Sequence, residues 1–496
     1  MRILLMLFVL CGTFLLFAQE TAAPATPTVG TEPTEVVPEA SVPAQPSVEE
    51  RLKALEDRTQ KAEEAQTRLA EENKKLQEEL AAKKTAEETK KPEPPKEEKK
   101  AVEFTPYGFI ELLGWANDAL FVGNDLTLYV SNEGQSTTGI TAKGSRIGTK
   151  VAFPRLEEVV LSATMEIDFV ANMADTGYAE SYPMIRMRHA YMELAKTWGN
   201  STLGFKAGQT WATATPTIWP ALINPAVGWG IGNTWQRMPL VEFSFTQKFA
   251  ETFAFTAQIA AARAMTGASA NRNGFLEVNI DAGDASHIPQ IQSQLSLKGA
   301  FSGIDMTVAA AGVWGRENYK GGVYPNNKKK ELKYIGGLVD VGMVTGALKL
   351  SHQYAEIAGK FWWGQNLDVF GVFGGSLITE NVSAATATAP EIKRVIGSQR
   401  ALGWWAQLTM KPLKELNLNV GYSSEDPEEG QKIGNTLCAP LYFENAALWV
   451  SAFYTLFERM TVGLQWTQVQ TKEFNTAAGR VSLTGNSIMG NVKLNF

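Results

Sequence analysis

The feature that most constrains this chain is a two-residue alternation of apolar and polar side chains from Phe104 to the C-terminus. In residues 161–169, Leu, Ala, Met, Ile and Phe alternate with Ser, Thr, Glu and Asp. Successive side chains of a strand point to opposite faces, so the pattern predicts strands with one apolar and one polar face. In a soluble sandwich the apolar face would form the core. In a membrane barrel it would contact lipid, and the polar face would line water.

The connections between the predicted strands decide between these two folds. About sixteen strand candidates can be recognised. Short turns are expected at residues 154–157, 196–200, 248–251, 300–303, 342–345, 411–414 and 455–458, and long connections at about 117–143, 171–183, 212–237, 265–288, 316–331, 357–398, 424–444 and 470–485. Regular alternation of short turns and long loops is typical of outer-membrane barrels. We therefore predict an all-β transmembrane barrel of about sixteen antiparallel strands over residues 102–496.

Aromatic residues and the last strand agree with this prediction. Phe153, Trp198, Phe249, Phe253, Phe301 and Phe457 flank the predicted short turns, where an interfacial girdle would lie, although core packing is the alternative for any single ring. Val492, Leu494 and Phe496 share one face of the terminal strand, which ends in an aromatic residue. This ending is similar to the signal that outer-membrane barrels present to their assembly machinery, which we therefore expect as a partner.

The segments before the barrel read as export and spacer sequences. Residues 1–18 combine Arg2, an apolar run and Ala18, as a signal peptide does; a helical anchor is the alternative, but the run is shorter than the ~20 residues of a spanning helix. Residues 19–47 form a linker rich in Pro, Thr and Ala, and residues 83–101 form a charged spacer that contains proline.

Between these spacers, residues 48–82 carry a heptad pattern with a partly polar core, which predicts an α-helical coiled coil. Its expected core residues are Leu52, Leu55, Ala62, Leu69, Asn73, Leu76 and Leu80. A lone charged helix is the alternative. We favour self-association, because a polar helix cannot bury such a thin apolar stripe by itself.

Composition excludes several function classes. The net charge of -6 is mild for 496 residues and gives no reason to expect a nucleic-acid partner. Cleavage of the signal would leave Cys438 alone, so no internal disulfide is expected. The three histidines, His189, His287 and His352, lie in no Ser/His or metal-ligand motif. We therefore expect no metal, no cofactor and no enzyme activity.

The third long connection is the expected pore constriction. Residues 212–237 are rich in Pro, Gly and Trp and contain little charge, whereas an exposed loop is usually more polar. Folding into the lumen would give its rings a surface to pack against; a cap over the mouth or a contact between subunits is the alternative. The expected constriction residues are Trp211, Trp219, Trp229 and Trp235.

Charged residues on the polar faces of neighbouring strands are expected to set selectivity. The basic ones are Arg146, Lys150, Arg186, Arg188, Lys206, Arg237 and Arg263, and Glu166 and Asp168 would form an opposing acidic patch. Arginine forks bind carboxylate or phosphate in a bidentate manner, so a basic majority would favour anions. The alternative is that these charges pair with one another and only solvate the pore.

Several motifs resemble those of a known family. Tyr107-Gly108-Phe109, Ser145-Arg146-Ile147-Gly148, Arg186-Met187-Arg188-His189-Ala190-Tyr191, Ala207-Gly208-Gln209-Thr210-Trp211 and Gln236-Arg237-Met238-Pro239 occur in the order seen in DcaP-type porins. The resemblance covers the first six strands by motif and the rest by architecture only. It implies a homotrimer of sixteen-stranded barrels with a periplasmic coiled coil, uptake of small anionic solutes such as dicarboxylates, and a pore lined by Arg146, Arg186, Arg188 and Arg237. The third loop departs from the family pattern.

The sequence thus predicts an outer-membrane porin for passive diffusion of small hydrophilic, anionic solutes, with its coiled-coil arm in the periplasm. A structural anchor that joins the barrel to the cell envelope through the arm is the alternative, with peptidoglycan as a candidate partner. A trimeric autotransporter would use only about four strands per chain, which the long strand region disfavours.

Overall fold

The structure is a computed structural model. It describes residues 101–122, 124–131, 134–155, 158–171, 184–223, 230–265, 282–319, 322–325, 331–335, 337–371, 377–383, 391–398, 400–428, 432–433, 436–437, 442–475 and 479–496, together with Arg68, Glu71, Glu72, Lys74, Lys75, Gln77 and Glu78. The chain divides into two units, Met1–Glu98 and Lys99–Phe496.

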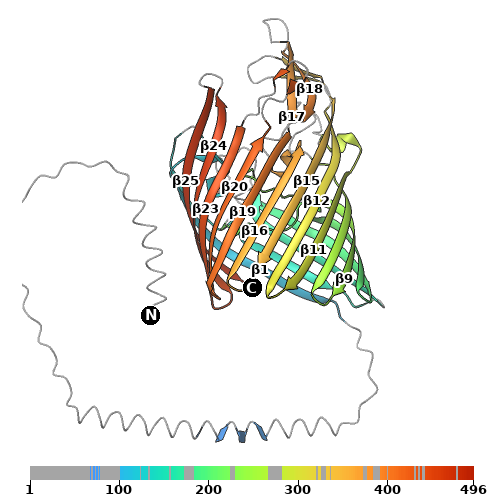
Figure 1. Cartoon of the computed structure of the whole chain (residues 1–496), viewed down its shortest axis with the longest axis vertical. Coiled ribbons are helices and arrows are strands. Elements are labelled where there is room, and N and C mark those ends of the chain that lie inside the picture. Colours follow the sequence, from blue (N-terminus) through green and yellow to red (C-terminus); the bar gives the residue numbers. More distant parts are fainter. Residues whose placement is uncertain are drawn as a thin grey trace, which may run out of the picture. The chain divides into compact units, whose positions relative to one another are not determined.

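The second unit is a closed antiparallel barrel (Figure 1). Its strands are β1 (Glu103–Asn117), β4 (Thr137–Thr141), β5 (Arg146–Ala152), β6 (Val159–Ala171), β7 (Met184–Trp198), β8 (Ser201–Trp211), β9 (Arg237–Ala250), β10 (Phe253–Ala262), β11 (Gln290–Phe301), β12 (Ile304–Tyr319), β15 (Gly337–Ser351), β16 (Ala355–Gln365), β19 (Arg400–Leu413), β20 (Leu416–Pro427), β23 (Tyr442–Leu456), β24 (Met460–Asn475) and β25 (Gly479–Asn495). Because β4 and β5 both pair with β1 at successive heights, these strands fill sixteen positions around the barrel, as predicted.

Pairing between the first and last strands closes the barrel. β1 pairs with β25 from Phe109↔Asn495 to Asn117↔Ser487. Phe496 continues the ladder, because Gly108 and Phe496 exchange backbone hydrogen bonds of 3.1 Å in both directions. A closed sheet leaves no edge strand, so every backbone group at membrane depth can be paired.

Short turns lie at one end of the barrel and the longer connections at the other (Figure 1). The predicted turn at 342–345 is wrong, because β15 runs through it and the turn follows at 352–354. Gly342 and Gly346 pair with Trp314 and Phe361 in continuous ladders on the two sides of β15.

The long connection predicted at 470–485 is also wrong. β24 extends to Asn475 and β25 begins at Gly479. Here the apolar face points inward, since Leu483 packs against a buried cluster that contains Phe121 and Val130, while Ser482 and Thr484 are exposed. Strands that continue beyond the lipid lose the outward apolar pattern on which the sequence prediction depended.

The outer wall is apolar at the level of the strands. In β6, Met165 is 55% exposed whereas Glu166 and Asp168 on the other face are buried, as the alternation predicts. Phe249, Phe301 and Phe457 beside the short turns are 68%, 73% and 81% exposed, which agrees with an interfacial girdle. Leu494 and Phe496 are also exposed, on the face they share with Val492.

Aromatic side chains on the inner wall cover glycines on the neighbouring strand. Trp115 pairs with Gly139, Trp362 with Gly403, and Trp449 with Gly421. A Cβ added at Gly403 would lie 2.4 Å from the Trp362 ring, so the indole occupies the space of the missing side chain. Such packing recovers the stability that a glycine otherwise costs a strand.

Smaller elements lie in the connections. They are β2 (Phe121–Val122), η1 (Asn124–Leu126), β3 (Tyr129–Val130), η2 (Asp284–Ser286), β13 (Gly322–Pro325), β14 (Glu331–Ile335), η3 (Asp368–Phe370), β17 (Leu377–Ser383), β18 (Glu391–Ser398), β21 (Lys432–Ile433) and β22 (Thr436–Leu437). β13, β14, β18 and β17 form a separate four-stranded sheet from two long connections, and Figure 1 shows β17 and β18 above the barrel rim.

In the first unit, the seven described residues between Arg68 and Glu78 are helical and exposed. None of them is an expected core position of the coiled coil, so the core residues, and with them residues 1–47 and 83–100, lie outside the described residues. Within the described part of the chain, no helix has the length and hydropathy to cross a membrane.

Candidate functional site

The connection between β8 and β9 crosses the barrel lumen. Inward-facing side chains of distant strands bind its backbone: Gln292 of β11 accepts from Ala214 N at 3.2 Å, Gln407 of β19 accepts from Ala221 N at 2.8 Å, and Gln465 of β24 accepts from Ile223 N at 2.7 Å. β11 and β24 stand on widely separated parts of the wall. The described parts of this connection, residues 212–223 and 230–236, therefore lie inside the barrel.

Further contacts fix the returning half of the loop. Trp362 Nε1 donates to Gly232 O at 2.8 Å, and Asn445 Nδ2 donates to Gly230 O at 2.9 Å. The buried ammonium of Lys360 donates to Thr234 O at 3.2 Å. A buried backbone carbonyl group without a hydrogen-bond donor is costly, so these three donors favour one path of the loop.

Apolar packing explains why the loop sequence contains so little charge. Ile218, Leu222 and Ile223 are at least nine-tenths buried and belong to a cluster with Trp405 and Trp449 of the barrel wall. Apolar loop residues thus fill the lumen beside β19 and β23. The remaining space lies beside the strands that carry the charged residues.

Three of the four predicted tryptophans meet at the neck of the loop. The ring centroids of Trp211 and Trp219 are 4.9 Å apart, and that of Trp235 lies 5.8 Å from Trp211 and 6.5 Å from Trp219. Trp229 lies outside the described residues.

The arginines of β5 and β7 pair with the acids of β6. Arg188 Nε lies 2.5 Å from Glu166 Oε1, Arg188 Nη1 lies 2.7 Å from Asp168 Oδ2, and Arg186 Nη2 lies 2.7 Å from the same Asp168 oxygen. Arg146 Nε is 3.4 Å from Glu166. The prediction of an acidic patch opposite the arginines is therefore wrong, because β6 lies between β5 and β7 and places its carboxylates in contact with both.

A β-bulge in β7 brings His189, which was not among the predicted site residues, into the cluster. Glu166 pairs with His189 and Ile167 pairs with Met187, which leaves Arg188 as the extra residue. A bulge shifts the phase of alternation, so Arg188 and His189 both lie on the buried inner side. Strict alternation would turn His189 toward lipid, and a bulge has no reliable signal in a single sequence.

Arg237 lies at the neck of the loop between two indoles. It is paired with Trp211 across β8 and β9, and its Cζ lies 4.7 Å from the Trp211 ring centroid and 5.5 Å from that of Trp235. The residue is 8% exposed, and Nη1 has no hydrogen-bond partner in the described part of the chain. Its guanidinium is thus held by two aromatic rings, with no carboxylate of the described residues in ion-pair contact.

The other predicted basic residues separate into two groups. Lys206 lies 3.0 Å from Glu193 and 3.6 Å from Glu242, and Lys150 lies over the ring of Tyr107. Arg263, by contrast, pairs with Asp284 of η2 at 2.5 Å in a long connection, and its hydrogen bonds lower the pKa of that carboxyl. Arg263 therefore does not belong to the lumen cluster.

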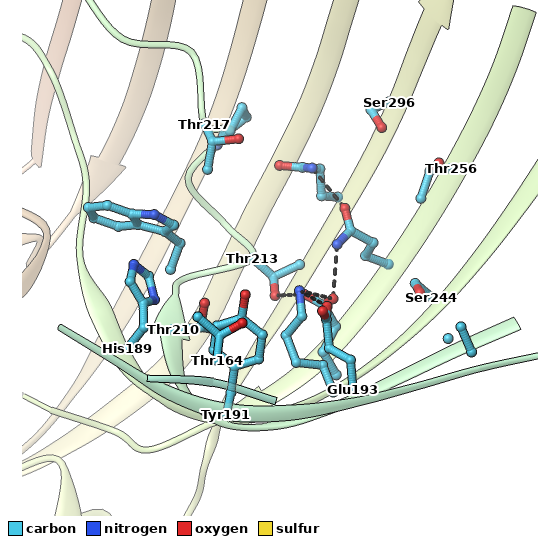
Figure 2. Close-up of a pocket in the computed structure, with 18 of the residues that line it drawn as sticks. Thr164, His189, Tyr191, Glu193, Thr210, Thr213, Thr217, Ser244, Thr256 and Ser296 are labelled. Carbon is cyan, nitrogen blue, oxygen red and sulfur yellow. Dashed lines mark hydrogen bonds and ion pairs between the residues drawn. The ribbon is translucent and has the colours of Figure 1, made fainter. Parts of the chain in front are cut away.

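A cavity of about 1110 Å³ is lined by inner-wall residues of β1, β5 to β12 and β15 and by loop residues between 212 and 218. Hydroxyls dominate its lining, and Figure 2 shows Thr164, Tyr191 and Thr210 near His189, with Ser244, Thr256 and Ser296 farther away. Gln258 donates to Glu242 at 3.0 Å and Gln294 donates to Gln258 at 2.8 Å, which forms a hydrogen-bonded track along this wall. Such a surface can replace the hydration shell of a small polar solute.

The described residues contain no group of three His, Cys, Asp or Glu side chains arranged to hold a metal ion. The chemistry that the cluster offers is ion pairing, hydrogen bonding and ring stacking.

Comparisons with known proteins support the architecture. No protein-family model matches the sequence, and no curated protein matches it. The outer membrane channel DcaP of Acinetobacter baumannii matches 80% of this chain and 98% of its own, with 16% identity and a TM-score of 0.56. The fold is that of the DcaP barrel. The resemblance to DcaP expected from the motifs is thus confirmed at the level of the fold.

Two other solved structures show weaker similarity than DcaP. The anion-selective porin from Comamonas acidovorans matches 80% of this chain and 100% of its own, with 10% identity and a TM-score of 0.48. Salmonella typhi OmpF, solved in complex with daunomycin, matches 79% and 97%, with 12% identity and a TM-score of 0.48.

Proposed function

We propose that this chain forms a water-filled channel in the bacterial outer membrane through which small hydrophilic anions, such as dicarboxylates, diffuse passively. The observation that carries the proposal is the charge imbalance beside the loop that crosses the lumen. Four guanidiniums, those of Arg146, Arg186, Arg188 and Arg237, lie near two carboxylates, those of Glu166 and Asp168, and no other carboxylate among the described residues forms an ion pair with them. Four minus two leaves two positive charges in the part of the lumen that the loop narrows.

The ion pairs weaken the electric field of these two positive charges without cancelling it. Arg186 remains 36% exposed at its side chain while bound to Asp168, so its charge can still act on a solute. Low-dielectric walls strengthen such fields in narrow pores. The loop supplies the narrowing, and its tryptophans give the constriction a rigid apolar side.

The cavity in the lumen would receive the solute after the constriction. Lys150, Lys206, Lys298 and Lys349 line it together with Glu166, Glu193 and Glu242, so the cations exceed the acids by one. Its many hydroxyls can exchange hydrogen bonds with a carboxylate or with its remaining water.

The wider assembly forms part of the proposal. We infer a cleaved signal peptide, a homotrimer in outer-membrane lipid, and a coiled-coil arm in the periplasm that could reach peptidoglycan. The outward C-terminal face of Val492, Leu494 and Phe496, of which the last two are exposed, would engage the assembly machinery before the barrel closes.

The test is the reversal potential of the purified full-length chain in a planar bilayer under a salt gradient. We expect stepwise conductance with anion preference. Stepwise conductance with cation preference would keep the channel and reject the anionic solutes. A folded barrel without conductance would reject the channel and leave the structural anchor.

A further inference from the structure

Nη1 of Arg237 and Nδ1 of His189 are among the buried nitrogen atoms that have no hydrogen-bond partner within the described residues. Each residue is only 8% exposed. Buried polar groups are normally paired, and an unpaired buried guanidinium is especially costly, so two such groups in one place indicate a missing partner.

Both residues pack on the same indole. The Arg237 guanidinium carbon lies 4.7 Å from the Trp211 ring centroid, and the His189 ring centroid lies 5.5 Å from it at an interplanar angle of 69°. Trp211 thus holds the two side chains within one local site. The β7 bulge supplies His189 to this site, and the first residue of β9 supplies Arg237.

The neighbouring arginines are already occupied. Arg188 binds Glu166 and Asp168, and Arg186 binds Asp168. Arg146 lies 3.4 Å from Glu166 as an ion pair. Arg237 has no ion pair within the described part of the chain. It is therefore the guanidinium of the cluster with the greatest capacity to bind an added anion.

We propose that Arg237 and His189 form a two-point binding site for the carboxylate of a solute, built on the face and edge of Trp211. Arginine presents parallel N–H donors that fit a carboxylate, and a histidine nitrogen can supply one further hydrogen bond. His189, Thr210 and Trp211 also line the cavity, so the rest of the solute extends toward its hydroxyls (Figure 2). This site rests on the proposed channel function and assigns it one specific binding step.

The small number of histidines makes the site measurable. The chain has three, so ¹⁵N-histidine labelling of the full-length protein in detergent yields few ring signals. The His189→Asn variant identifies the His189 signal, and succinate is the probe. We expect succinate to shift that signal in a saturable way and to leave those of His287 and His352 unchanged.

Variants of the arginine provide the second readout. Arg237→Gln should weaken succinate binding about ten- to a hundredfold, the range expected when a charged hydrogen bond is lost. Arg237→Lys keeps the positive charge but loses the two parallel N–H donors of the guanidinium, and should weaken succinate binding less than Arg237→Gln does. Arg263→Gln removes an arginine outside the cluster and should bind as the parent does. If Arg237→Gln does not fold, the comparison of Arg237→Lys with Arg263→Gln decides the question.

The site and the channel can fail separately. If the His189 signal does not move, or if it moves equally in Arg237→Lys and the parent, the binding site is overturned even if the channel conducts anions. If the signal shifts as expected but planar bilayers show no conductance, the site stands and the channel function is rejected.

Discussion

Arg188 donates a hydrogen bond of 2.5 Å from Nε to Oε1 of Glu166 on the neighbouring strand. The same guanidinium donates from Nη1 to Asp168 at 2.7 Å. One bulged arginine therefore bridges two buried carboxylates, each of which also pairs with a second arginine, Arg146 for Glu166 and Arg186 for Asp168. The electric field in the lumen therefore depends on the balance of arginines and carboxylates within this one cluster, and not on a basic wall facing an acidic wall.

Replacing Arg186 and Arg188 with Ala should lower anion preference. The variant leaves two guanidiniums against two carboxylates, so the net positive charge of the cluster disappears. A unit charge about 8 Å from an ion in water changes its energy by about 0.5 kcal/mol, or about twofold in permeability for each charge removed. Reversal potentials in a salt gradient measure the change. Arg263→Ala is the matched control, and an unchanged potential in the double variant would reject the assignment.

Replacing Glu166 with Gln and Asp168 with Asn should have the opposite effect. The four arginines would then meet no carboxylate in the cluster, and anion preference should rise by a similar factor of about two per charge. The measurement is the same. A fall in anion preference would mean that the released arginines leave the lumen and no longer act on the solute.

Gln407→Leu should loosen the loop that crosses the lumen. The Gln407 carboxamide oxygen accepts from Ala221 N at 2.8 Å and from Trp449 Nε1 at 3.2 Å, so both buried donors lose their partner. The cost should be about 1–3 kcal/mol, and single-channel recordings should show larger or noisier conductance. Gln470→Leu is the control, because Gln470 is exposed and its side chain bonds no described residue other than Ser482, at 3.1 Å. Equal conductance in both variants would argue against a loop held by Gln407.

Gly403→Ala should destabilise the barrel, because the new methyl group would lie 2.4 Å from the Trp362 ring. Displacing a packed indole costs about 1–3 kcal/mol. Gly346→Ala offers a matched control, since a Cβ there meets nothing within 4 Å. The readout is the temperature at which the folded barrel loses its faster migration on semi-native gels. A lower temperature for Gly346→Ala than for Gly403→Ala would contradict the packing argument.

The heptads of residues 48–82 should self-associate. A peptide of this segment buries its thin apolar stripe only against other copies, so sedimentation equilibrium should report an oligomer, and the family resemblance favours a trimer. Asn73→Leu should strengthen the association and relax its strand number, because a buried Asn specifies register at a cost in stability. A monomer at high concentration would remove the support for a coiled coil.

The sequence by itself determined the barrel. Strand geometry fixes a period of two, and lipid requires one of the two faces to be apolar, so Met165 and Glu166 could be assigned to opposite faces without any partner strand. The number of strand positions followed from the turns. The prediction was wrong where β15 runs through the turn expected at 342–345, and where β24 and β25 continue beyond the lipid with their apolar residues facing inward.

Only the tertiary structure decided the site. His189 faces the lumen because a bulge opposite Glu166 shifts the phase of β7, and alternation in one chain cannot reveal that shift. The acids pair with the arginines because β6 stands between β5 and β7. The loop follows its path because Gln292, Gln407 and Gln465 bind its backbone from strands up to 242 residues away in sequence. The alternation of apolar and polar residues in one strand shows which face contacts lipid. These contacts depend instead on which distant residues the closed barrel brings together.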